Sequence, residues 1–226
     1  MNILVIGNEV QKLQCQEKFG AHSHLLAADH QEAKKLFGSV EIVFDFIAAD
    51  NPKQMEVYCD HLHPITFLNT TTKTLTELSR ETNHRLTGTL FGFCGMPTFL
   101  GRPLLETSLR SQGDLEKLKE VCISLNTEFV VVDDRVGLVT PRVICMIINE
   151  AYYTVQEGTA TREDIDLAMK LGTNYPFGPF EWCQKIGVQH VYELLDAMYA
   201  DTKDERYKIS PLLKKEYLML NKARAL

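Results

Sequence analysis

Short apolar runs alternate with amphipathic stretches over the first half of the chain. The run Ile3–Ile6 is rich in branched side chains, ends at Gly7 and precedes a polar, helix-compatible stretch over residues 10–19. The alternation continues with expected strands at 23–28, 41–48 and 65–68 and expected helices at 31–37 and 52–62. Because strands that alternate with short helices form right-handed βαβ units, this pattern predicts a parallel sheet.

The alternation gives way to a purely helical pattern in the second half. Apolar positions recur at helical spacing over 115–126, and the β-branched run at 128–132 predicts one more strand. From Val143 onward the periodicity is helical, with glycines and prolines between the segments. We therefore expect an α/β fold class, with a shortened Rossmann-like domain over 1–134 and an all-α domain over 135–226.

Composition and charge exclude several classes of protein. The 226 residues are 45% hydrophobic and 24% charged, and no stretch has the ~18–20 uninterrupted apolar residues of a membrane span. The N-terminus lacks the pattern of a secretory leader, and the six cysteines form no C-x-x-C pair, so we expect a cytoplasmic protein with free thiols. The formal net charge of -6 argues against nucleic acid or an anionic membrane as partner.

The first strand and helix have the order of a dinucleotide-binding βαβ unit, but the glycine fingerprint is incomplete. Counted from Gly7, the second and third glycine positions of G-x-G-x-x-G hold Glu9 and Lys12. Asp29 stands at the end of the second expected strand, where an acidic residue would bind the ribose hydroxyls. The alternative interpretation is that Asp29 caps the helix that follows it.

Four segments of the second half follow one another in a specific order: Gly137-Leu-Val-Thr-Pro-Arg142, Ile148-Asn-Glu-Ala151, Glu163-Asp-Ile-Asp-Leu-Ala-Met-Lys-Leu-Gly172 and Tyr175-Pro-Phe-Gly-Pro-Phe-Glu181. Together they resemble the C-terminal domain of 3-hydroxyacyl-CoA dehydrogenases. Upstream, three further segments resemble strand and loop landmarks of the same family: Asp45-Phe-Ile-Ala, Phe67-Leu-Asn-Thr-Thr-Thr72 and Arg85-Leu-Thr-Gly88.

The resemblance implies a set of functional properties. It implies an NAD domain followed by a helical dimerisation domain, and oxidation of L-3-hydroxyacyl-CoA to 3-ketoacyl-CoA by hydride transfer. It implies NAD as cofactor, with Gly7, Asp29 and Asn69 as candidate cofactor-binding residues, an acyl-CoA-type substrate and a homodimer. The plain structural interpretation of residues 69–72 is a turn at the end of a strand.

The catalytic residues that the resemblance implies are only partly present. The family's histidine base lies two residues after the glycine of R-x-x-G-x-H-F-F, and alignment from Arg85 places Leu90 there. Glu106 matches the orienting glutamate, although it could equally be a surface or capping carboxylate, and Thr71 matches a serine and keeps the hydroxyl. Pro141 replaces an asparagine and removes its amide. Glu106 and Thr71 are therefore the candidate catalytic residues.

Histidines elsewhere in the chain offer alternatives that remain open. His63 or His84 could supply a substitute base through an altered loop. The pairs His22/His24 and His61/His63 have metal-ligand character but no third ligand nearby, so no metal is expected. Two interpretations follow: a dehydrogenase of reduced activity, or an acyl-CoA-binding or dimeric interaction module without catalysis. We expect NAD binding to be weak or absent in either case.

Overall fold

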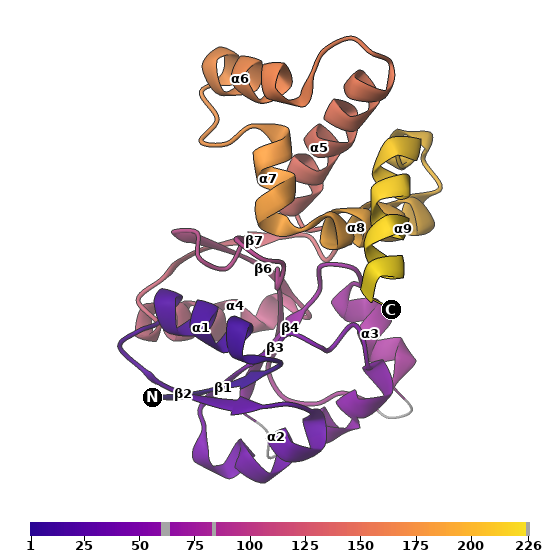
Figure 1. Ribbon diagram of the computed structural model, residues 1–226. Helices are drawn as coiled ribbons and strands as arrows, with labels where there is room; N and C mark the ends of the chain where they lie inside the picture. Colours follow the sequence, from indigo (N-terminus) through magenta and orange to yellow (C-terminus); the bar gives the residue numbers. More distant parts are fainter. Residues whose placement is uncertain (60–63, 83–84, 225–226) are drawn as a thin grey trace. The chain divides into compact units, whose positions relative to one another are not determined.

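The computed structural model of the protein describes residues 1–59, 64–82 and 85–224 (Figure 1). The chain divides into two compact units. The first consists of Met1–Gly95 and Phe99–Leu138, and the second consists of Met96–Thr98 and Val139–Leu226.

The first unit is built on one seven-stranded sheet with the strand order β2-β1-β3-β4-β5-β6-β7. The strands are β1 (Asn2–Ile6), β2 (Ser23–Ala27), β3 (Ile42–Asp45), β4 (Ile65–Asn69), β5 (Leu90–Phe93), β6 (Leu104–Leu109) and β7 (Glu128–Val132). All neighbouring pairs are parallel except β5 and β6. The chain runs from β1 to β2 on one side and returns to β3 on the other. This reversal of order makes the carboxyl ends of β1 and β3 the expected ligand crevice of such a sheet.

Helices cover both faces of this sheet, as Figure 1 shows. One apolar layer joins the sheet to α1 (Glu9–Lys18) and α4 (Leu115–Ser124), and its phenylalanine rings stack, with Phe44 and Phe67 at 4.8 Å between centroids. The opposite layer joins the sheet to α2 (His30–Leu36), α3 (Leu75–Glu81) and the 3₁₀ segment η2 (Pro52–Tyr58). Both faces are thus apolar, as a buried parallel sheet requires.

The described residues of the second unit form helices joined by loops and contain no strand. Its helices are α5 (Thr140–Gln156), α6 (Arg162–Thr173), α7 (Pro179–Ile186), α8 (Val188–Thr202) and α9 (Pro211–Arg224), with a short 3₁₀ turn at Glu205–Tyr207. Asp166 on α6 accepts hydrogen bonds from the Phe180 and Glu181 amides at 2.7 and 3.1 Å, and so caps α7 from a neighbouring helix. Thr161 and Gly178 begin α6 and α7, and Asn174 ends α6 in the left-handed conformation.

The fold class expected from the sequence is confirmed, with differences in detail. Alternating strands and helices form a mostly parallel sheet, and a helical region follows it. The segment at 52–62 was expected as a helix, but Pro52–Tyr58 form a 3₁₀ stretch, and residues 60–62 lie outside the described part of the chain. The sheet also contains one antiparallel pair, because β6 runs back along β5 after the loop at 94–103. That loop contains glycines and prolines that obscured both strands in the sequence.

Candidate functional site

The sequence-predicted site residues of the first unit gather at one edge of the sheet. Gly7 follows β1, Asp29 lies just after β2, and Asn69 ends β4, so all three stand at the carboxyl ends of parallel strands. Because β6 is antiparallel to β5, with Thr107 opposite Phe93, Glu106 belongs to the same edge. This is the edge at which open α/β sheets bind ligands.

Asn69 connects three strand ends. Its Nδ2 donates a hydrogen bond to the Phe46 carbonyl at 3.1 Å, just beyond β3. Its Oδ1 accepts hydrogen bonds from the Gly95 amide at 3.0 Å and from the Thr71 amide at 3.2 Å. A Cβ at Gly95 would lie 2.7 Å from the Asn69 Cγ, so only glycine permits this close approach. Asn69 therefore fixes the backbone around the site.

Thr71 and Asn69 are in direct contact, as their shared motif suggested. The Thr71 hydroxyl donates to Asn69 Oδ1 at 2.6 Å and lies 3.6 Å from the Cys94 Sγ. Thr71 and Cys94 are both buried. Cys94 comes directly after β5, and the sequence interpretation had not assigned it a role.

The loop after β1 is closed on itself. The Asn8 side chain accepts a hydrogen bond from the Gln11 amide at 3.1 Å, and the Gln11 side chain accepts one from the Asn8 amide at 2.9 Å. This capping box uses amide groups at the start of α1. The Gln11 side chain lies over Gly7, since a Cβ at Gly7 would come within 2.1 Å of Gln11 Oε1. Glu9 is exposed beside it and pairs with Lys12 at 3.5 Å.

Asp29 caps α2 in this structure. Its carboxylate accepts a hydrogen bond from the Glu32 amide at 2.8 Å, and its backbone is extended, as an N-cap requires. Ser, Thr, Asn and Asp are the common residues at such a position, so the capping role was visible in the sequence.

The remaining positions of the implied catalytic set have different surroundings. Leu90 opens β5 opposite Thr66 and is fully buried in the apolar layer, at the other end of β5 from Thr71 and Cys94. Glu106 is half-buried within β6. Pro141 is buried in the first turn of α5, a position at which proline needs no hydrogen-bonding partner for its nitrogen. His63 and His84 lie outside the described residues.

A buried polar cluster stands beside this edge, and sequence reasoning missed it. The Asp45 Oδ2 lies 2.7 Å from His30 Nε2 and accepts a hydrogen bond from the Tyr58 hydroxyl at 2.9 Å. All three side chains are fully buried. Burial lowers the pKa of His30, but the hydrogen bond and charge of Asp45 outweigh it, and Gln54 also contributes, so the net pKa of His30 is raised. Burial, with Asp45, raises the pKa of Tyr58 well above its ordinary value.

The helical unit holds a second polar cluster between α5, α6, α7 and α9. Arg162 pairs with Glu216 and lies over the Tyr152 and Phe180 rings, and the Tyr152 hydroxyl donates to Glu216 at 2.7 Å. Burial raises the pKa of the Cys183 thiol to about 11. These groups satisfy one another, so they tie four helices together rather than present reactive atoms.

Residues 1–59, 64–82 and 85–224 hold no group of three or more His, Cys, Asp or Glu side chains arranged for a metal ion. Over the same residues, every helix is too short or too polar to cross a membrane.

Comparison with known proteins identifies the class to which this fold and edge belong. Residues 137–224 match the family "3-hydroxyacyl-CoA dehydrogenase, C-terminal domain". The chain is 32% identical over 149 residues to a 3-hydroxybutyryl-CoA dehydrogenase of Clostridioides difficile. This alignment covers 65% of this chain and 53% of that protein. It is 31% identical over 156 residues to the mitochondrial hydroxyacyl-coenzyme A dehydrogenase of Sus scrofa, covering 68% and 49%.

Solved structures show the same fold. The crystal structure of PaaH1, an (S)-3-hydroxybutyryl-CoA dehydrogenase from Ralstonia eutropha, superposes with a TM-score of 0.71 at 19% identity, over 95% of this chain and 92% of that one. FadB2 of M. tuberculosis superposes with a TM-score of 0.72 at 16% identity, over 94% and 92%.

The chain belongs to the 3-hydroxyacyl-CoA dehydrogenase family, as its sequence motifs indicated. It spans about half the length of the Clostridioides difficile and Sus scrofa relatives.

Proposed function

We propose that the chain is a 3-hydroxyacyl-CoA dehydrogenase-like protein that binds an acyl-CoA-type ligand and has impaired or lost dehydrogenase activity. The observation that supports impaired or lost activity is the closed loop after β1, in which the Gln11 side chain lies over Gly7. The family's reaction is NAD-dependent, so a loop that does not admit the cofactor removes the hydride acceptor.

The residues of this loop do not fit the pyrophosphate of NAD. A Rossmann fold binds that group against the bare glycine and the free amides of the first helix. Here Gln11 fills the space over Gly7, and the Asn8–Gln11 capping box uses the amides of Asn8 and Gln11. The exposed Glu9 carboxylate adds a negative charge at the same place, which its partner Lys12 offsets only in part at 3.5 Å. Asp29, the implied ribose ligand, is engaged as the cap of α2.

The acyl-CoA part of the proposal rests on the family and on the polar groups that remain. The relatives that the chain resembles act on 3-hydroxyacyl thioesters by name. Asn69 and Thr71 keep their hydrogen-bonding groups at the carboxyl end of β4, where such a substrate or its cofactor would lie. Both features support binding of the thioester without requiring turnover.

Separate titrations test the two halves of this proposal. Isothermal titration calorimetry with acetoacetyl-CoA and with NADH should show binding of the thioester and weaker binding of NADH. The Gln11→Ala variant should bind NADH more tightly than the parent, whereas the matched Gln14→Ala variant on the same helix should not. Sub-micromolar binding of NADH by the unmodified protein would show that the closed loop is no obstacle.

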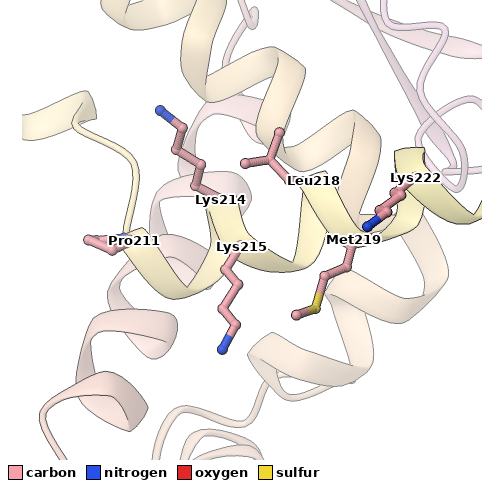
Figure 2. A pocket seen from close by; sticks show the side chains of 6 residues that line it. All are labelled: Pro211, Lys214, Lys215, Leu218, Met219 and Lys222. Carbon is pink, nitrogen blue, oxygen red and sulfur yellow. The ribbon is translucent and has the colours of Figure 1, made fainter.

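We also infer that the helical unit forms a homodimer. Leu218 and Met219 on α9 are exposed and, with lysines of the same helix, line a pocket whose side chains Figure 2 shows. On α6, Leu167 and Leu171 are exposed on a helix whose first turn is acidic. Apolar faces of opposite charge favour contact between two copies of this unit. Light scattering should give twice the chain mass at micromolar concentration, and a monomer throughout that range would contradict the inference.

A further inference from the structure

Two hydroxyl groups lie against the bare backbone of Gly92 in β5, and a cysteine follows two residues later. Gly92 has no side chain, and a Cβ built there would lie 2.2 Å from Ser108 Oγ and 2.5 Å from Thr70 Oγ1. The Ser108 hydroxyl therefore approaches Gly92 from β6, and the Thr70 hydroxyl approaches it from the residue that follows β4. Cys94 lies two residues further along, with its Sγ 3.6 Å from the Thr71 hydroxyl.

The buried Ser108 hydroxyl is unpaired among the described residues. The side chain of Ser108 is fully buried, and its Oγ has no hydrogen-bond partner among the residues that the structure describes. Leaving a buried hydroxyl unpaired is unfavourable, because its bonds to water are lost and not replaced. A native site that accepts this cost commonly offers the group to a ligand or water. The Ser108 hydroxyl lies against Gly92, two residues before Cys94.

The register of the sheet places Cys94, rather than Leu90, at the ligand edge. Leu90 pairs with Thr66 at the amino ends of β4 and β5 and is buried in the apolar layer. In the antiparallel pair, Gly92 stands opposite Ser108 and Phe93 opposite Thr107, so continuing the register brings Cys94 opposite Glu106. Cys94 also lies two residues after a glycine, Gly92, which is the spacing that the family motif gives for its base.

We propose that Cys94 stands at the position of the family's base and that its thiol, with the Thr71 and Ser108 hydroxyls, contacts the acyl end of a CoA thioester. This inference rests on the proposed binding of acyl-CoA and assigns the residues that meet the reactive end of that ligand. A thiol is a weak hydrogen-bonding group with an ordinary pKa of ~8.5, so it replaces an imidazole poorly as a base near neutral pH. Such a site retains the ligand contact while the proton transfer is lost.

Affinity labelling with bromoacetyl-CoA tests this assignment on the full chain. If the acyl end lies at Cys94, the Sγ displaces bromide from the bromoacetyl carbon. A sulfur–carbon bond then forms, the carbon–bromine bond breaks, and the thiol proton passes to the buffer. Peptide mass spectrometry reads the labelled residue. Cys59 is the internal control, since it is the one half-buried thiol, and the other cysteines are buried.

The expected result is a change of selectivity between two reagents. Iodoacetamide, which has no CoA part, should label Cys59 ahead of Cys94. Bromoacetyl-CoA should raise the ratio of Cys94 to Cys59 labelling at least tenfold, and excess acetyl-CoA should suppress the labelling of Cys94. Labelling confined to Cys59, or labelling of Cys94 that acetyl-CoA leaves unchanged, would overturn the inference.

Two variants test which position the thiol must occupy for directed labelling. Cys94→Ser removes the thiol with little change of volume and should abolish the directed labelling. Adding Leu90→Cys to that variant should not restore the labelling, because position 90 lies at the far end of β5. Directed labelling at position 90 would refute the assignment.

Titration with acetyl-CoA separates this inference from the proposed function. Absence of binding contradicts the proposed function, whereas binding without labelling of Cys94 contradicts this inference alone.

Discussion

Removal of one hydroxyl from the buried cluster of the first unit should destabilise the fold by a measurable amount. Asp45 Oδ2 is held by Tyr58 and His30, and Asp45 Oδ1 accepts the Ile47 amide at 3.0 Å. Tyr58→Phe keeps the ring that stacks on Phe37 at 5.7 Å and deletes only the donor to the carboxylate. Hydrogen bonds to charged groups contribute about 1.5–3 kcal/mol, so we expect a loss of that size in the free energy of unfolding.

Urea unfolding followed by far-UV circular dichroism measures this loss. Tyr175→Phe is the matched control, since Tyr175 is 37% exposed and lies in the other unit, and it should change the free energy by less than about 0.5 kcal/mol. Trp182 is the one tryptophan of the chain and lies in α7, so its fluorescence reports the second unit separately. A loss below about 0.5 kcal/mol for Tyr58→Phe would refute the view that this hydroxyl supports the buried carboxylate.

Three further outcomes follow from the same contacts. Because the folded-state pKa of His30 is raised, its charged ring stabilises the fold below pH ~6.5, and this contribution disappears as the pH rises through the folded-state pKa. An NMR titration that gives a pKa of His30 at or below 6.5 would contradict this expectation. Asn69→Ala removes the bonds to Phe46, Thr71 and Gly95 and should cost about 2–3 kcal/mol in urea unfolding, whereas a cost under about 1 kcal/mol would mean that water replaces them. Asp166→Ala removes the cap of α7 and should cost about 1–2 kcal/mol, read by tryptophan fluorescence, and an unchanged midpoint would count against the cap.

Local pattern was enough to predict the strands that lie within βαβ units. The runs that became β1, β2, β3, β4 and β7 are apolar, short and bounded by polar residues or turns, so periodicity marked them. The capping role of Asp29 was likewise predictable from local sequence, because aspartate just before a helical stretch is a common N-cap. The contacts of Asn69 with the ends of β3 and β5 were out of reach, since they join residues 23 and 26 positions apart.

The buried cluster illustrates what a sequence cannot reveal. His30, Asp45 and Tyr58 belong to a helix, a strand and a 3₁₀ turn, and each looks ordinary in its own segment. Only the packing of α2 and η2 on the sheet brings them together in an apolar layer. Burial then makes their mutual hydrogen bonds obligatory, because an unpaired carboxylate there would be costly.

The position of the implied base depends on the strand register. Two glycines in this segment, Gly88 and Gly92, are each followed two residues later by a candidate, Leu90 and Cys94. Spacing alone does not choose between them. The pairing of β5 with β4 does, since it places Leu90 at the amino end opposite Thr66 and brings Cys94 to the carboxyl end beside Thr71. A side chain at the amino end of a parallel strand lies about three residues, or ~10 Å, from the ligand edge, so histidine at position 90 would be out of reach of a substrate held there.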